Sequence, residues 1–303
     1  SGLCDNLARN RTDSHCRCAM PFLSIVFTYL LARYTAVAKW LHHDGWLTSL
    51  INSLAAAWPR RDVVFFAVPV AGSLLVLLVL WRLPFWPEFF LGVLLLLFSV
   101  GRGDWHSGLA DLAARLRSGD AEAVWLGLEE EGFVSDGNGE PGQGLWLAWR
   151  RHAGSWYLNR LFGVFFWFFL LGPAGAVFYR LTSLYNGHPQ VSAGNLPSYR
   201  RWQWMLEWLP VRYMALCCCL AGNFTPGFHI WRQLLLDTHL SSADFLAECM
   251  EASLLQDNGA ETLPAVDESV RLTVMRSPSL DELLVRTEVI GLAGLALVIL
   301  VLG

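Results

Sequence analysis

The chain has 303 residues, of which 54% are hydrophobic and only 16% carry a charged side chain. Soluble domains carry about 25% charged residues, so this composition argues against an ordinary soluble protein. The net charge of −4 provides no overall positive field, which argues against nucleic acid as a partner. The composition instead indicates an integral membrane protein whose main partner is the lipid bilayer.

Residues 1–19 form a polar stretch ahead of the first apolar segment, and we predict a disordered N-terminal extension there. The stretch contains Cys4, Cys16 and Cys18, but their spacing matches no zinc motif. Met20 directly precedes the apolar segment, so we expect the folded domain to cover residues 20–303. We expect no metal and no cofactor.

Three apolar segments follow, each predicted to be a helix: Pro21–Ala38, Val63–Trp81 and Glu88–Val100. A bilayer core of about 30 Å requires roughly 20 apolar residues per helix, and Val63–Trp81 meets that requirement. The short link after Arg82 predicts a tight helical hairpin. Lys39–Asp62 is rich in tryptophan, which is typical of a segment at the membrane surface.

Residues 101–160 form a polar excursion between apolar segments. Leu109, Ala113 and Leu116 recur at helical spacing, and a break at residues 118–120 precedes a second short helix that ends at Gly132. This pattern predicts a small amphipathic helical hairpin. Six arginines lie in the excursion, and the excess of basic residues predicts a cytoplasmic location.

The second half contains the strongest predicted span, Leu161–Tyr179, which is interrupted only at Gly172-Pro173. Leu209–Leu220 is short, so it either crosses the membrane or re-enters it. Phe228–Leu255 predicts one or two amphipathic helices, and Gln256–Pro278 a polar linker. Ser279 and Glu282 resemble a capping box that opens a last helix, ending in the apolar run Val289–Leu302. The prediction is an all-α polytopic bundle of about five spans with amphipathic cytoplasmic helices.

The candidate ligand-binding residues are basic or amide side chains beside apolar segments: Arg212, Arg180, Asn159 and Arg160. Arginine at membrane depth is costly and usually faces protein or water, and its guanidinium binds phosphate or carboxylate with two hydrogen bonds. These residues therefore predict a cavity for an anionic ligand. The alternative is that each arginine only marks the membrane surface. No nucleotide-binding loop or nucleophile elbow is present, so we predict no catalytic residue.

Three blocks of the sequence carry a family resemblance: FSVGRGDWHSGLADLAARLRSGD (Phe98–Asp120), LFGVFFWFFLLGPAGAVFYRLTSL (Leu161–Leu184) and WLPVRYMALCCCLAGNF (Trp208–Phe224). They resemble AmpE, a family of inner-membrane proteins of Gram-negative bacteria encoded beside a muropeptide amidase. The order and spacing of the blocks also match, from Met20 to Gly303.

AmpE is distantly similar to adenosylcobinamide-phosphate synthase, which carries a Glu-Asn-x-x-Asp cluster before its Phe-Trp block. The corresponding residues here, Ser155–Arg160, include no carboxylate. The resemblance therefore implies a retained fold without the synthase chemistry.

The resemblance implies a multi-pass inner-membrane modulator of β-lactamase induction and peptidoglycan recycling. Its expected partners are cell-wall fragments or the muropeptide amidase system. Two alternatives stay open: an amide-forming membrane enzyme related to the synthase, and a muropeptide transporter. The absence of visible internal repeats in the sequence argues against the transporter.

Overall fold

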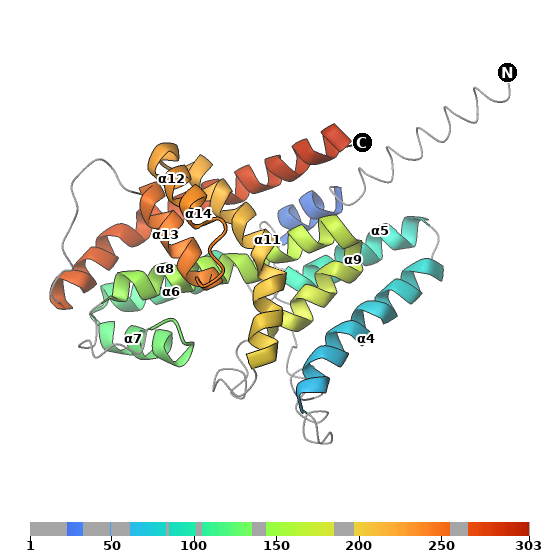
Figure 1. Cartoon of the computed structure of the whole chain (residues 1–303), viewed down its shortest axis with the longest axis horizontal. Helices are drawn as coiled ribbons and strands as arrows, with labels where there is room; N and C mark the ends of the chain where they lie inside the picture. Colours follow the sequence, from blue (N-terminus) through green and yellow to red (C-terminus); the bar gives the residue numbers. More distant parts are fainter. Residues whose placement is uncertain are drawn as a thin grey trace. The chain divides into compact units, whose positions relative to one another are not determined.

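The computed structural model describes residues 23–32, 49, 61–82, 85–100, 105–134, 144–184, 197–254 and 266–302, and the predicted N-terminal extension lies outside them. The described chain is helical and contains no strand. The helices are Leu23–Ala32, α4 (Arg61–Arg82), α5 (Phe85–Val100), α6 (Trp105–Arg117), α7 (Ala121–Glu130), α8 (Leu145–Tyr157), η1 (Leu158–Phe162), α9 (Gly163–Leu184), α11 (Pro197–Ala221), α12 (Phe224–Leu234), α13 (Ser242–Leu254) and α14 (Val266–Leu302) (Figure 1). The all-α prediction is confirmed for these residues.

The chain divides into two compact units, and the division follows the hydropathy of the sequence. Unit 1 contains Ser1–Arg102, Val164–Thr182 and Leu292–Gly303, and unit 2 contains Gly103–Gly163 and Ser183–Gly291. Unit 1 thus collects the most apolar stretches of the chain. Unit 2 combines most of the predicted excursion at residues 101–160 with the later segment Ser183–Gly291.

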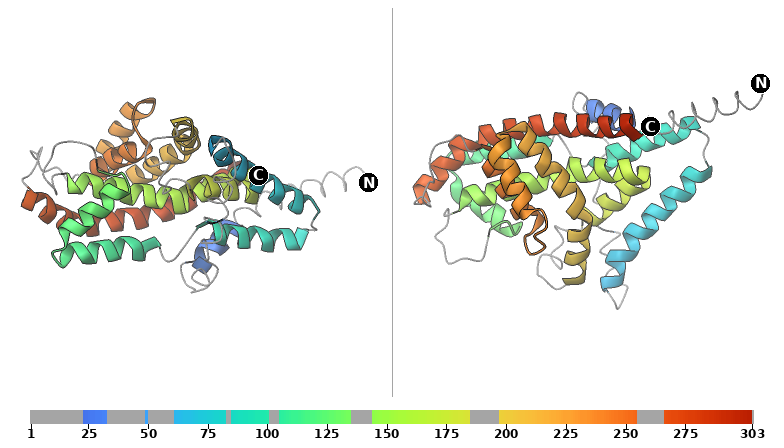
Figure 2. Two further views of the ribbon diagram at one scale, coloured as in Figure 1. Left: turned by 90° about the horizontal axis from the view of Figure 1, so that it is seen from below. Right: turned by 45° about the horizontal axis from the view of Figure 1, so that its top comes forward.

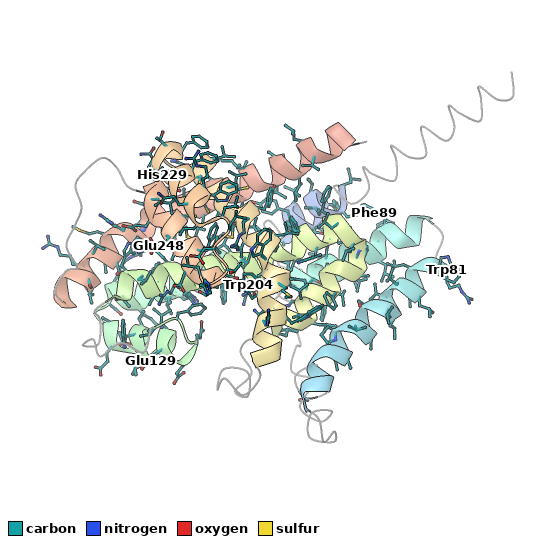
Figure 3. The ribbon with its side chains drawn as sticks, in the orientation of Figure 1. Trp81, Phe89, Glu129, Trp204, His229 and Glu248 are labelled. Atoms are coloured by element: carbon teal, nitrogen blue, oxygen red, sulfur yellow. The ribbon has the colours of Figure 1, made fainter. Side chains whose placement is uncertain are left out.

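Unit 1 exposes large aliphatic side chains, whereas a soluble protein buries most side chains of this kind in its core. On α4, Leu75 is 66% exposed and Leu78 is 64% exposed. Trp81, next to the last residue of the helix, is 84% exposed (Figure 3). At Gly72, α4 packs closely on α9, because an added Cβ there would lie 2.6 Å from the Leu181 side chain.

Two described helices are long and apolar enough to cross a membrane, Leu145–Leu184 and Arg201–Ala221. The first is broken at Gly172, whose φ of 68° and ψ of −159° are not helical. The predicted interruption at Gly172-Pro173 is therefore confirmed. Shorter apolar helices cover Leu23–Ala32, Ala67–Arg82 and Phe89–Val100. The bundle of about five spans stays a prediction.

Unit 2 begins with the helical hairpin predicted from the periodicity of its apolar residues. Helices α6 and α7 pack together, and Leu109, Ala113 and Leu116 of α6 are at most 2% exposed. The turn between them contains Gly119 with a φ of 89°, a conformation that favours glycine. The sequence pattern thus placed both helices and the turn.

The core of unit 2 is built by α8, α11, α12 and α13. Helix α13 contacts the other three, and its residues Phe245, Leu246 and Met250 are fully buried. Gly154 of α8 allows a close approach, since a Cβ there would lie 2.6 Å from the Met250 side chain. The predicted amphipathic region Phe228–Leu255 is therefore two helices, and both pack against α11.

From Val266 on, the predicted linker Gln256–Pro278 is corrected by α14, which is helical from Val266 to Leu302 and contains Pro278. Residues 256–265 of the linker lie outside the described ranges. The predicted capping box at Ser279 is corrected by the same helix. Proline has no N–H to donate to the carbonyl four residues earlier, that of Val274. The hydroxyl of Ser277 donates to this carbonyl instead, at 3.3 Å. Burial of Leu280 and other residues along α14 then keeps the helix continuous, so Ser279 lies inside it and caps nothing.

Helix α11 uses its apolar residues inside unit 2. Met214, Ala215, Cys218 and Cys219 are fully buried there. The four described cysteines are buried free thiols, which behave as small apolar side chains in a packed helix. The hydropathy of α11 is thus accounted for by the core of unit 2.

Candidate functional site

Arg212, the leading candidate from the sequence, is held between three helices of unit 2. Its guanidinium carbon lies 4.7 Å from the ring centre of Trp208 on α11 and 4.5 Å from that of Phe245 on α13. Trp208 and Arg212 meet because residues four apart share one face of a helix. The side chain is only 6% exposed.

The donors of Arg212 are directed to main-chain oxygens beyond the end of α12. Nε donates to the Leu235 carbonyl at 3.3 Å, and Nη2 donates to the Asp237 carbonyl at 3.2 Å. Trp231 of α12 returns a hydrogen bond from Nε1 to the carbonyl of Arg212 at 3.0 Å. The last carbonyls of a helix have no partner within it and carry partial negative charge. Arg212 therefore fastens the end of α12 to α11.

Asn159 and Arg160 lie in η1, a single π-helical turn between α8 and α9. Such turns are rare and are often found at functional sites, because they rotate side chains away from the regular helical register. Both residues are half-buried, and η1 packs against α11. The guanidinium carbon of Arg160 lies 3.6 Å from the ring centre of Trp156, one turn earlier.

Trp156 and Arg160 continue a row of contacting side chains, which we call the α8 column: Phe133 beyond the end of α7, His152 and Trp156 on α8, and Arg160 in η1. The ring centres of Phe133 and His152 are 5.3 Å apart, and those of His152 and Trp156 are 5.7 Å apart. His152 is 7% exposed, whereas Trp156 and Arg160 are half-buried. The column ends in the Arg160 guanidinium, which lies over the ring of Trp156.

Glu131 adds a carboxylate to the buried end of the α8 column. Its Oε2 lies 2.9 Å from Nδ1 of His152, and its side chain is 55% exposed. In the sequence, the acidic run Glu129–Glu131 indicates only the solvated end of a helix. The contact arises because α7 packs against α8, which sequence spacing does not reveal.

A second charged cluster was not predicted from the sequence, and it centres on Glu251 of α13. Its carboxylate accepts hydrogen bonds from Nε1 of Trp146 at 2.7 Å and Nη1 of Arg276 at 2.9 Å. Nη1 of Arg150 lies 3.4 Å from the same carboxylate and donates to the Ala247 carbonyl at 2.5 Å. These contacts join α8, α13 and α14, so the cluster binds its own helices together.

The fourth predicted residue, Arg180, is 8% exposed and belongs to α9 in unit 1. The other three belong to unit 2, where η1 carries Asn159 and Arg160 against α11, the helix of Arg212. The cavity shared by Arg180 and Arg212 stays a prediction. Of the four, Asn159 and Arg160 are the more exposed to solvent.

Within the described ranges, no group of three or more His, Cys, Asp or Glu side chains has an arrangement that could hold a metal ion. The cysteines and histidines of residues 1–22 lie outside those ranges. No family model, curated protein or solved structure matches the chain.

Proposed function

We propose that the protein is a multi-pass inner-membrane protein of the AmpE type, in which unit 1 lies in the bilayer and unit 2 faces water. The exposed aliphatic side chains of unit 1 are the observation that carries this proposal. Leu74, Leu75, Leu77 and Leu78 on α4 are all more than 50% exposed, as is Phe90 on α5. Contiguous apolar surface of this kind is stable against lipid and costly against water.

Unit 2 supports the second part of the proposal. Arg150, His152, Glu207, Arg212 and Glu288 are charged or ionisable side chains buried in it. Arg150 and Arg212 donate to main-chain carbonyls, so their contacts stabilise the packing of the helices. From the resemblance to AmpE, we propose a regulatory role in β-lactamase induction and peptidoglycan recycling, carried out by binding rather than by catalysis.

The α8 column is the surface of unit 2 best suited to an anionic cell-wall fragment. The Arg160 guanidinium lies over the Trp156 ring, and its planar group of donors suits a carboxylate. Asn159 on the adjacent turn adds an amide that can donate and accept hydrogen bonds. This placement keeps the anionic ligand predicted from the sequence but moves its main contacts from Arg212 to η1 and the end of α8.

The test is β-lactamase induction in a strain deleted for the gene and complemented with wild type, Trp156→Ala, Arg160→Gln or a control, Leu236→Ala. Leu236 is 79% exposed and lies outside the column. We expect deletion to change induction, and we expect wild type and the control to restore it while the two column variants do not. Protein levels in the membrane fraction must be equal for all variants.

Unchanged induction after deletion would refute the regulatory role. Full restoration by both column variants would leave that role intact and refute the assignment of the column.

A further inference from the structure

Helix α9 folds back on itself at Gly172. In a continuous helix, residues 167 and 175 would be separated by about 12 Å along the axis. Here a Cβ placed on Gly175 would lie 2.6 Å from Cβ of Leu171 and 3.1 Å from the carbonyl carbon of Trp167. Figures 1 and 2 accordingly show α9 as two arms that meet at a sharp turn. The absent side chain of Gly175 lets the arms approach each other.

Neither arm of α9 is long enough to cross a bilayer. At 1.5 Å per residue, Gly163–Leu171 covers about 14 Å and the second arm, from Pro173 to Leu184, covers about 18 Å. The hydrocarbon core is about 30 Å thick. The helix before the turn continues back through η1 into α8, but these residues pack against α11 and α13 in unit 2. Only the arms of α9 itself are therefore available to enter the bilayer.

The contact of the α9 turn with α5, inside unit 1, indicates how far along α5 the turn reaches. Pro173 packs on α5, its Cγ lying 3.5 Å from the position of a Cβ on Gly92. Gly92 is seven residues after Phe85, the first residue of α5, which corresponds to about 10 Å along that helix. The turn therefore meets α5 near its middle and does not reach its first residue.

The packing of unit 2 imposes a matching constraint, because chain segments from before and after α9 meet in one core. Arg151 of α8 donates from Nε to Asp244 of α13 at 2.6 Å, and Trp146 of α8 donates to Glu251 of α13. Extensive packing of α8 against α13 surrounds these bonds. A single crossing by α9 would place α8 and α13 on opposite sides of the membrane and break this core.

We propose that α9 is a re-entrant helical hairpin, which enters the bilayer and leaves it on the same side, with Gly172-Pro173 at its tip. This inference rests on the proposed membrane location of unit 1. Both chain segments of unit 2 then lie on one face of the membrane. Irregular backbone at membrane depth is tolerated where protein covers it, and the packing of Pro173 against α5 provides such cover.

The hairpin also removes a conflict in the distribution of basic residues. With a full crossing, Arg200 and Arg201 would lie on the opposite side from Arg150 and Arg151. With the hairpin, all four lie on one side, together with the other arginines of residues 101–160. Basic residues concentrate on the cytoplasmic side of membrane proteins, so we place unit 2 in the cytoplasm.

The test is cysteine labelling in cells with a maleimide that cannot cross the inner membrane, using full-length protein in which Cys4, Cys16 and Cys18 are replaced by serine. Ala114→Cys on α6 reports the segment before α9, and Gln233→Cys on α12 reports the segment after it. Both side chains are exposed. The control Arg82→Cys, at the exposed end of α4, reports the opposite face of the membrane.

We expect Ala114→Cys and Gln233→Cys to be protected in intact cells and labelled after permeabilisation, whereas Arg82→Cys is labelled in both. Labelling of only one of the two unit 2 positions in intact cells would overturn the hairpin. Recovery of the protein in the soluble fraction would instead refute the membrane location and, with it, the hairpin.

Discussion

The contacts of Arg212 predict that its main effect is on the stability of unit 2. In Arg212→Met, the carbonyls of Leu235 and Asp237 lose their charged donor, and two aromatic rings lose their stacked cation. A hydrogen bond to a charged group contributes about 1.5–3 kcal/mol, and a cation–π contact contributes about 0.5–1 kcal/mol. Water reaches part of the freed carbonyls, so we expect a net loss of about 3 kcal/mol.

For a unit of this size, about 3 kcal/mol corresponds to a decrease in Tm of about 6–12 °C. Intrinsic tryptophan fluorescence of the detergent-solubilised protein reports the change, because Trp208 contacts the Arg212 guanidinium and Trp231 binds its carbonyl. The control is Arg286→Ala, which breaks an exposed ion pair with Glu282 one turn away. Exposed pairs of this kind contribute about 0.3–0.5 kcal/mol.

A Tm of Arg212→Met within about 2 °C of the control would refute this reasoning, because about 2–4 °C corresponds to only 1 kcal/mol of stability. Arg212 would then be free to act as the ligand-binding residue that the sequence suggested.

Three further predictions concern other parts of the chain. Gly172→Ala places a side chain at a φ of 68° and ψ of −159°, a conformation essentially confined to glycine, and should destabilise the protein by about 1–3 kcal/mol. The control Gly127→Ala, where a Cβ meets no atom within 4 Å, should raise Tm slightly. Equal effects of the two substitutions on Tm would contradict the turn geometry. Burial raises the pKa of Asp281 to about 6, against the opposing effect of Arg117, so the folded state binds extra protons between about pH 4 and 6 and the stability of the fold falls as pH rises through this window. Asp281→Asn should therefore raise Tm at pH 8 and not at pH 4.5. An equal gain at both pH values would contradict the assignment. Glu251→Gln removes the negative charge that faces Arg150 and Arg276, and it should lower the free energy of unfolding by about 2 kcal/mol, measured by urea unfolding in detergent. An unchanged urea midpoint would show that the cluster does not join its helices.

The sequence predicted best those features that depend on local pattern. The α6–α7 hairpin follows from the spacing of Leu109, Ala113 and Leu116 and from the break at Gly119. The interruption at Gly172-Pro173 was also predicted, because glycine followed by proline rarely continues a helix. Its consequence, a chain that folds back, depends on the φ and ψ of Gly172, which the residue type permits but does not determine.

Features that depend on distant contacts were not predicted. Glu251 and Trp146 are 105 residues apart, and no spacing rule connects them. The capping signal at Ser279 was overridden by burial along α14 and by the hydroxyl of Ser277, which satisfies the carbonyl opposite Pro278. The partners of Arg212 were not predicted for a related reason, since they are main-chain carbonyls of a loop whose course is not visible in the sequence.

The most direct test of the division into a lipid-facing and a water-facing unit is photolabelling in native membranes with a lipid-soluble carbene precursor, followed by peptide mapping. The account predicts labelling of α4 and α5, with α6, α7, α12 and α13 unlabelled. Labelling of α12 and α13 to the same extent as α4 would contradict it, as would the absence of label from α4 and α5.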